Sequence, residues 1–193
     1  GMDAANQAEV DNAILNIMPD AKIKLGGNAV AATSAAVLKA GANALGIPLY
    51  RHIGGAGAMY LPVPGVAMAA GDERYGGGIT TPGGKPTMSV MAFGFDKFAD
   101  ASYACWEVHT RWAEKMKKKF GGLPNIRDFI SIPEGIYNSD KEIWEEMLKT
   151  IIEAGYEGKM GFQMDVATDT YHNKEDDKYY GLFDRTPKTK EQL

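Results

Sequence analysis

The residue that most invites chemistry in this sequence is Asp165, which ends the apolar stretch of "KMGFQMDVA". In α/β barrels, the side chains at the carboxyl ends of the strands carry the chemistry, so a carboxylate at this point suggests an enzyme. A simpler explanation exists, because an Asp that follows a strand is more often a turn or helix-capping residue. The choice between the two depends on whether the surrounding elements build such a barrel.

Other polar groups give weaker signals. Asp72, Glu73 and Arg74 stand together ahead of a glycine-rich loop. They could form an ion pair or bind an anion, although a solvated turn is the simpler explanation. The loop ends in Lys85-Pro86, whereas a phosphate-binding loop has Ser or Thr directly after its lysine, which argues against nucleotide binding. The three histidines are scattered along the chain, so the sequence predicts no histidine metal site.

The composition is that of an ordinary globular protein. The 193 residues are 45% hydrophobic and 24% charged, which excludes general disorder. A net charge of −4 gives no electrostatic footprint for nucleic acid or an anionic membrane, so we expect neither as a partner. The single cysteine, Cys105, excludes an intrachain disulfide and a cysteine-based zinc cluster. The sequence shows no secretion signal and no apolar stretch of about 18 residues, so a cytoplasmic protein is expected.

The spacing of apolar residues predicts two units, a helical one over residues 1–60 and a mixed α/β one over 61–193. In the first unit, helices are expected over 3–18, 28–46 and 48–55. The helix over 28–46 is rich in small residues, which let another backbone approach closely. We therefore expect it to be buried on more than one side.

The second unit is predicted to alternate strands and helices. Strands are expected over 63–70, 87–95, 129–133 and 159–167, and helices over 96–120 and 139–155. This β-β-α-β-α-β order predicts consecutive strands that are joined by helices and packed as a curved sheet.

Local signals refine these elements. Ser139 is predicted to cap the helix over 139–155 in a capping box with Glu142. Asp176-Asp177 marks a hairpin-like turn near the C-terminus. The apolar side chains of the helix over 96–120 include Phe98, Tyr103, Trp106 and Val108.

Three ordered stretches of the chain carry a recognisable pattern. "KIKLGGNAVAATSAAVLKAGANALGIPLYRHIGG" is similar to K-x-K-L-G-A-N-A-I … G-x-P-L-Y-R-H-I, and "LPVPGVAMAAGDERYGGG" is similar to L-P-V-P-x-x-N-x-x-N-G-G-x-H-A. "AGYEGKMGFQMDVATDTY" is similar to A-G-Y-x-G-K-x-x-I-x-M-D-V-A-x-S-E-F-Y. Together they resemble the enolase family. The resemblance implies an α/β fold with a partial enolase-type (β/α) barrel, preceded by a helical unit from the family's N-terminal domain.

The resemblance also implies a reaction and its residues. Enolases are phosphopyruvate hydratases of glycolysis that convert 2-phosphoglycerate to phosphoenolpyruvate and water with Mg²⁺. By resemblance, Asp165 is the metal ligand, and the metal charge stabilises a dianionic intermediate. Glu134 is similar to the glutamate of the family's G-D-E-G-G loop, which helps remove hydroxide. That match requires a shorter loop, and Pro133 and Ile136 depart from it, so a solvated loop glutamate remains the alternative.

Departures from the family pattern bear on activity. Arg74 occupies the position of the family's histidine, and Ala70 that of an asparagine. No acidic residue lies between Arg74 and Phe95, so the family's substrate-contacting glutamate has no counterpart. The matched stretch begins after the family's N-terminal sheet and stops before the strands that supply two further metal ligands and the catalytic lysine. We therefore expect Mg²⁺ binding to be weakened or lost and the isolated chain to be inactive.

Two functions remain open from the sequence. The chain could be one part of an enolase that a complementary enolase-like chain completes. Alternatively, it could be a non-catalytic enolase-like domain that acts through oligomerisation or partner binding. A partial barrel leaves open strand edges, which must be paired or covered. Either a homo-oligomer or a complementary chain is therefore predicted.

Overall fold

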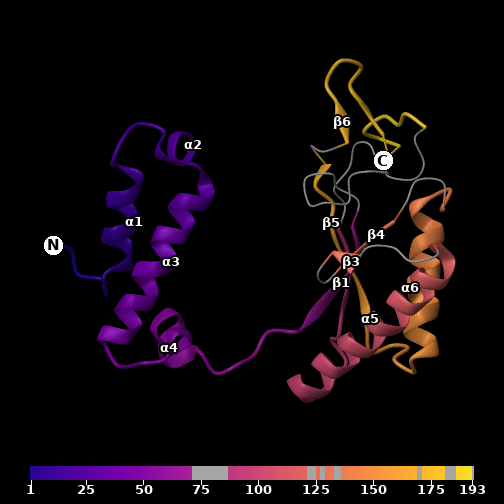
Figure 1. The fold of residues 1–193 in the computed structure, drawn as a ribbon, viewed down its shortest axis with the longest axis horizontal. Helices are drawn as coiled ribbons and strands as arrows, with labels where there is room; N and C mark the ends of the chain where they lie inside the picture. Colours follow the sequence, from indigo (N-terminus) through magenta and orange to yellow (C-terminus); the bar gives the residue numbers. More distant parts are fainter. Residues whose placement is uncertain are drawn as a thin grey trace. The chain divides into compact units, whose positions relative to one another are not determined.

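The computed structural model describes residues 1–70, 87–120, 125–126, 129–132, 136–168, 171–180 and 186–192. They belong to two compact units, Gly1–Leu61 and Pro62–Leu193, and Figure 1 labels most of their helices and strands. The first unit contains helices alone, and the second combines a sheet with two long helices.

The first unit contains four α-helices and a short 3-10 turn. They are α1 (Gln7–Leu15), α2 (Ala21–Leu25), α3 (Gly27–Ala44), α4 (Leu49–Gly54) and the turn Gly55–Gly57. The prediction of one helix over 3–18 is too long at both ends. The side chain of Asn6 caps α1 by accepting a hydrogen bond from the backbone N–H of Glu9 at 3.3 Å. This N–H lies in the first turn, where the helix itself offers no acceptor.

Helix α3 ends as the sequence predicts but is less buried than expected. Gly46 has φ +65°, and the N–H of Ile47 donates to the carbonyl of Ala42 at 3.1 Å, as in a glycine C-cap. A Cβ added at Gly41 would collide with the carbonyl oxygen of Ala4, so this glycine permits one close backbone contact. Only Gly41 and Ala42 of α3 are buried. The expected burial on more than one side is therefore wrong.

No single helix among the described residues is both long and apolar enough to span a bilayer. The helices over 27–44 and 49–57 satisfy that test only when taken together, and they are bent by 97° relative to each other.

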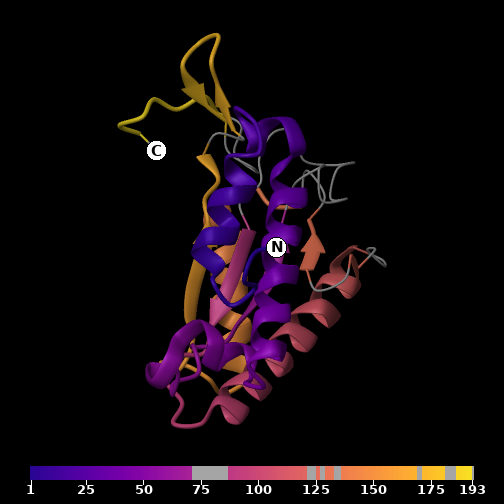
Figure 2. The same cartoon turned by 90° about the vertical axis from the view of Figure 1, so that its left-hand side faces the viewer.

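The second unit is built on a five-stranded sheet of order β3-β4-β1-β2-β5. Its strands are β1 (Gly65–Ala70), β2 (Thr87–Met91), β3 (Asn125–Ile126), β4 (Phe129–Ser131) and β5 (Gly161–Asp165). Figure 2 shows β5 and β3 at opposite edges of the sheet. Helices α5 (Phe98–Phe120) and α6 (Asp140–Glu153) lie on the same side of it (Figure 1). A hairpin of β6 (His172–Asn173) and β7 (Lys178–Tyr179) follows.

The sequence pattern did not predict the strand order. β4 pairs in parallel with β1, and β5 pairs antiparallel with β2. The reason is that β1 and β2 pair antiparallel with each other, which leaves one free side on each of them. The described strands form an open sheet and no closed barrel. This mixed α/β arrangement agrees with a partial enolase-type fold.

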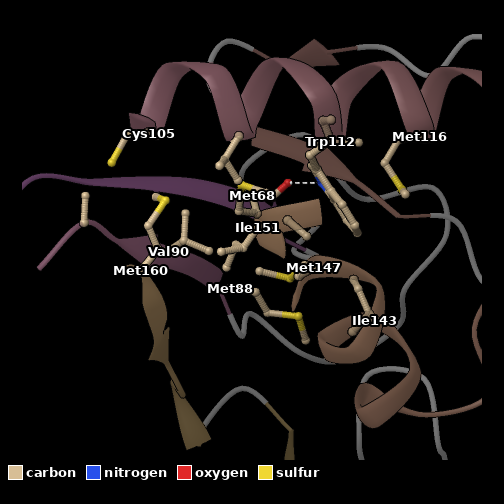
Figure 3. Close-up of a cluster of buried hydrophobic side chains, with 14 of the residues drawn as sticks. Met68, Met88, Val90, Cys105, Trp112, Met116, Ile143, Met147, Ile151 and Met160 are labelled. Atoms are coloured by element: carbon tan, nitrogen blue, oxygen red, sulfur yellow. Dashed lines mark hydrogen bonds between the residues drawn. The ribbon is translucent and has the colours of Figure 1, made fainter. Parts of the chain in front are cut away.

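The core lies between the sheet and the two helices. Figure 3 shows its buried side chains, among them Met68, Val90, Trp112, Met116 and Met147. Trp112 is fully buried, and its indole Nε1 donates to the backbone carbonyl of Met68 at 2.9 Å. Met68 lies at a β-bulge in β1, where the pairing register shifts. A bulged residue leaves the ladder locally unpaired, so the indole satisfies a buried acceptor.

The apolar face predicted for α5 is only partly correct. Val108 is buried, whereas Phe98, Tyr103 and Trp106 are 42%, 58% and 59% exposed. The rings of Tyr103 and Trp106 contact each other, with centroids 5.4 Å apart. The buried face of α5 consists instead of Ala101, Ala104, Cys105, Val108, Trp112 and Met116.

The local signals in the second unit hold with one change. The Oγ of Ser139 accepts a hydrogen bond from the N–H of Glu142 at 3.4 Å, as predicted. The carboxylate of Glu142 reaches one residue further back and accepts from the N–H of Asn138 at 2.8 Å. Asp177 adopts φ +54° between β6 and β7, which confirms the hairpin turn.

The buried indole hydrogen bond generates a stability prediction. Trp112→Phe should lower the free energy of unfolding by about 1–3 kcal/mol, because it leaves the Met68 carbonyl unsatisfied and opens a small cavity. The measurement is urea denaturation followed by circular dichroism. Trp106→Phe makes the same chemical change at an exposed site of the same helix and should stay within about 0.5 kcal/mol of the original. Equal losses for the two variants would contradict the role of this hydrogen bond.

Candidate functional site

Asp165 lies at one end of a row of residues that crosses four strands. It pairs with Thr87 of β2, Thr87 pairs with Ala70 of β1, and Ala70 pairs with Ser131 of β4. We call these four residues the terminal row. With roughly 4.8 Å between neighbouring strands, the backbones of Ser131 and Asp165 are separated by roughly 14 Å. The row contains the last residues of β1, β4 and β5, so the carboxyl ends of three strands meet at one end of the sheet.

The sheet has two different faces, and Asp165 belongs to the open one. Side chains alternate along a strand, so Phe162 and Met164 of β5 share a face while Asp165 lies on the other. Phe162 and Met164 pair with Val90 and Met88, which are buried beneath α5 and α6. Asp165 therefore lies on the face that the two helices leave uncovered, and its side chain is exposed.

The other predicted site residues lie outside the described part of the chain. Arg74 follows the end of β1, and Glu134 follows the end of β4. In the sequence, both positions come shortly after a strand whose last residue belongs to the terminal row. Asp72 and Glu73 also fall outside the described residues. Of the predicted site residues, only Asp165 has a described position.

The described oxygen ligands at this end of the sheet could contribute to a magnesium site but do not complete one. Mg²⁺ prefers oxygen ligands and is usually held by one or two carboxylates together with water and substrate oxygens. Asp165 offers an exposed carboxylate, and Thr87, its cross-strand neighbour, carries a hydroxyl. Within the described residues, no group of three or more His, Cys, Asp or Glu side chains could hold a metal. The terminal row alone is therefore not a closed metal site.

Tyr137 fixes the chain shortly after Glu134, and sequence reasoning missed it. Its side chain is 4% exposed, and its hydroxyl donates to Glu146 Oε2 at 2.5 Å. The Nζ of Lys119 donates to the same oxygen at 2.7 Å and lies 4.1 Å from the centre of the Tyr137 ring. The segment that follows Glu134 is thus anchored to both α5 and α6. Nothing in "SIPEGIY" signals this anchor.

This anchor shifts the pKa values of its members. Burial, followed by the hydrogen bond to Glu146, raises the pKa of Tyr137. Burial alone would raise the pKa of Glu146, but the hydrogen bonds from Lys119 and Tyr137 outweigh it and leave that pKa below its usual value. The phenol is therefore neutral and the carboxylate charged near neutral pH, which maintains the donor and acceptor roles seen in the structure.

A second set of shifted groups lies away from the terminal row. The hydroxyl of Tyr156 donates to Glu107 at 2.7 Å, and this bond raises the pKa of Tyr156 to about 12. Hydrogen bonds from Arg111 and then Tyr156 lower the pKa of Glu107. Tyr156 precedes β5, whereas Asp165 ends it. These groups form a cluster of one ion pair and one hydrogen bond that connects α5 to the segment before β5. Structural networks of this kind also shift pKa values, so these shifts do not mark a functional site.

Comparison with known proteins shows which family this chain is similar to. The family described as "Enolase, N-terminal domain" matches residues 1–53, and "Enolase, C-terminal TIM barrel domain" matches residues 58–193. An enolase of Methanococcus aeolicus is 30% identical over 181 residues, which cover 93% of this chain and 41% of that enolase. An enolase of Campylobacter lari is 32% identical over 185 residues, which cover 93% of this chain and 42% of that enolase.

These matches cover only part of the relatives but most of this chain. The chain spans about two-fifths of the length of the relatives it matches. The C-terminal barrel domain alone matches more than half of the chain, from residue 58 to residue 193, and the sheet has Asp165 at the carboxyl end of one of its strands. This chain belongs to the enolase family.

Proposed function

We propose that this chain contributes the metal-binding strand of an enolase-type site, which converts 2-phosphoglycerate to phosphoenolpyruvate and water. The observation that carries the proposal is the position of Asp165. It ends β5 on the uncovered face of the sheet, beside the carboxyl ends of β1 and β4. The "MDVA" motif around it is the part of the chain that resembles the family's metal-binding strand most closely.

Each proposed residue has a role that follows from its chemistry. The carboxylate of Asp165 would hold Mg²⁺, which when bound stabilises the negative charge that develops on the substrate's carboxylate. Glu134, after β4, would assist the departure of hydroxide. Arg74 carries a permanent positive charge, so at the position of the family's histidine it could hold an anionic substrate group but could not transfer a proton.

We propose that these 193 residues alone do not catalyse the reaction. Between Arg74 and Phe95 the sequence has no acidic residue, and no residue of the chain matches the family's catalytic base. The remaining groups would have to come from elsewhere, for example from a complementary enolase-like chain. The family's glycolytic reaction further suggests a cytoplasmic location.

A second candidate function is association without catalysis. It is favoured by the edge position of β5, which pairs on one side with β2 and with no other described strand. Phe162, the second residue of this strand, is 47% exposed. Exposed apolar edge strands readily pair with other chains, so an enolase-like unit with this edge is suited to oligomerisation.

The metal role of Asp165 can be tested by calorimetry. Titration of the chain with Mg²⁺ in the presence of 2-phosphoglycerate should give saturable binding that depends on both components. Asp165→Asn should weaken it by on the order of tenfold or more, because the substitution removes the charge of a direct ligand.

Asp177→Asn is the matched control for that titration. Asp177 is an exposed aspartate of the same unit, and Asn tolerates its positive φ. This variant should bind Mg²⁺ and 2-phosphoglycerate as the original chain does. Metal-dependent binding that persists unchanged in Asp165→Asn would rule out Asp165 as the ligand.

The absence of catalysis by the isolated chain is a separate prediction. Formation of phosphoenolpyruvate, followed by its ultraviolet absorbance, should be at least several orders of magnitude slower than with a complete enolase, because residues that act as a unit fail together. Turnover close to that of a complete enolase, from a preparation shown by mass spectrometry to be free of host enolase, would refute it.

A further inference from the structure

Ala167, two residues after Asp165, holds a backbone conformation that alanine rarely adopts. Its φ is +44°, in the left-handed region where the Cβ of an L-residue lies too close to the following carbonyl oxygen. Within the described residues, the only other non-glycine residues with positive φ are Asp20 and Asp177. Asp tolerates this region because its short polar side chain can bond to the local backbone. Ala167 is therefore the one of the three whose side chain does not suit its backbone.

The chain is fixed on both sides of Ala167. Before it, Asp165 is the last residue of β5 that pairs with β2. After it, the N–H of Tyr171 donates to the carbonyl of Thr168 at 3.2 Å, and the carbonyl of Tyr171 accepts from the N–H of Tyr180 at 2.9 Å. These bonds tie the chain to the β6–β7 hairpin, whose strand β6 lies beyond the end of β5 in Figure 1. A strained residue persists only where its surroundings determine its conformation, and here the sheet and the hairpin do so.

The left-handed residue decides where β5 ends. In an extended strand, residues two apart lie on the same face, so an extended Ala167 would follow Asp165 along the uncovered face of the sheet. A left-handed residue turns the chain out of the strand direction instead. Asp165 is thereby the last residue of β5 on that face, and its side chain is exposed.

The pairing of Asp165 with Thr87 depends on this turn. Directly opposite residues of an antiparallel pair have Cβ atoms roughly 4.5–5.5 Å apart, so Thr87 limits the Asp165 side chain on the side of β2. Among the described strands, β5 has no neighbour on its other side. The end of β5 is therefore held only by its pairing with β2 and by the chain that follows it. Without the turn it could slip against β2, and a slip of one residue moves every side chain to the opposite face.

We propose that Ala167 is a positioning residue for the candidate metal site. Its left-handed backbone, held between the sheet and the hairpin, fixes the end of β5 and so the direction of the Asp165 carboxylate. Strained backbone is typical of sites in which it pre-organises a ligand group, and here it lies two residues from the proposed ligand. The consequence for metal binding rests on the proposed role of Asp165, whereas the effect on the position of Asp165 does not.

Two substitutions of nearly equal size separate backbone conformation from packing. Asn adopts the left-handed region far more readily than a β-branched residue does, so Ala167→Asn should preserve the end of β5 and Ala167→Val should displace it. Ala167 is half-buried, and burial alone would favour Val over Asn. The two explanations therefore predict opposite orders for the two variants.

The position of Asp165 can be measured by NMR without a metal. In isotope-labelled protein, nuclear Overhauser contacts between Asp165 and Thr87 report their pairing. The original chain and Ala167→Asn should show these contacts, and Ala167→Val should lose them. Contacts between Phe162 and Val90, further along the same ladder, should remain in all three and show that the sheet is folded. Equal Asp165–Thr87 contacts in the Val and Asn variants would overturn the proposal.

Calorimetry with Mg²⁺ and 2-phosphoglycerate measures the consequence for binding. Ala167→Asn should bind within about twofold of the original chain, and Ala167→Val should bind on the order of tenfold more weakly, as expected for loss of a group that orients a metal ligand. Asp20→Val is the matched control, because it places the same side chain at a φ of 58° in the first unit. It should leave the binding unchanged.

The two measurements distinguish failure of this inference from failure of the proposed function. If Ala167→Val loses the Asp165–Thr87 contacts but binds as the original chain does, Ala167 positions Asp165 but Asp165 is not the metal ligand. If the original chain shows the contacts and does not bind Mg²⁺ with 2-phosphoglycerate, the metal role fails, and the contacts in the two variants still decide the role of Ala167.

Discussion

The second unit depends on the packing of two helices against one face of an open sheet. Trp112 connects the two layers, because its indole both fills the core and satisfies the carbonyl of Met68 at the β1 bulge. One-sided packing then has two consequences. It leaves Asp165 on a face that the helices do not cover, and it leaves the outer side of α6 and the edge of β5 without a described neighbour.

Much of this fold could be predicted from the sequence. Apolar runs indicate the strands and long helices, Gly46 and Ser139 mark helix ends, and Asp176-Asp177 marks a hairpin. The strand order could not be predicted, because pairing joins residues far apart in the chain and depends on which sides of β1 and β2 remain free. The apolar face of α5 was partly misjudged since Tyr103 and Trp106 stack on each other outside the core. Periodicity alone does not distinguish such a pair from core residues.

The candidate site was less predictable than the fold. Asp165 could be found because an acid directly after an apolar strand is conspicuous and because the "MDVA" motif resembles the family's. Its neighbour Thr87 could not, since that contact is a matter of sheet register. Tyr137 was missed because a single tyrosine after a loop carries no pattern, although it anchors the segment after Glu134 to both helices. The roles of Glu134 and Arg74 remain predictions, since both lie outside the described residues.

The central claim is that Asp165 still binds a divalent cation at the end of β5. Mn²⁺ can replace Mg²⁺ at oxygen-rich sites and broadens the NMR signals of nearby nuclei. Substoichiometric Mn²⁺ added with 2-phosphoglycerate to isotope-labelled protein should broaden the amide signals of Asp165 and Thr87 first, and Asp165→Asn should remove this effect. Broadening centred on other carboxylates, such as Asp176 and Asp177, with Asp165 unaffected would contradict the claim.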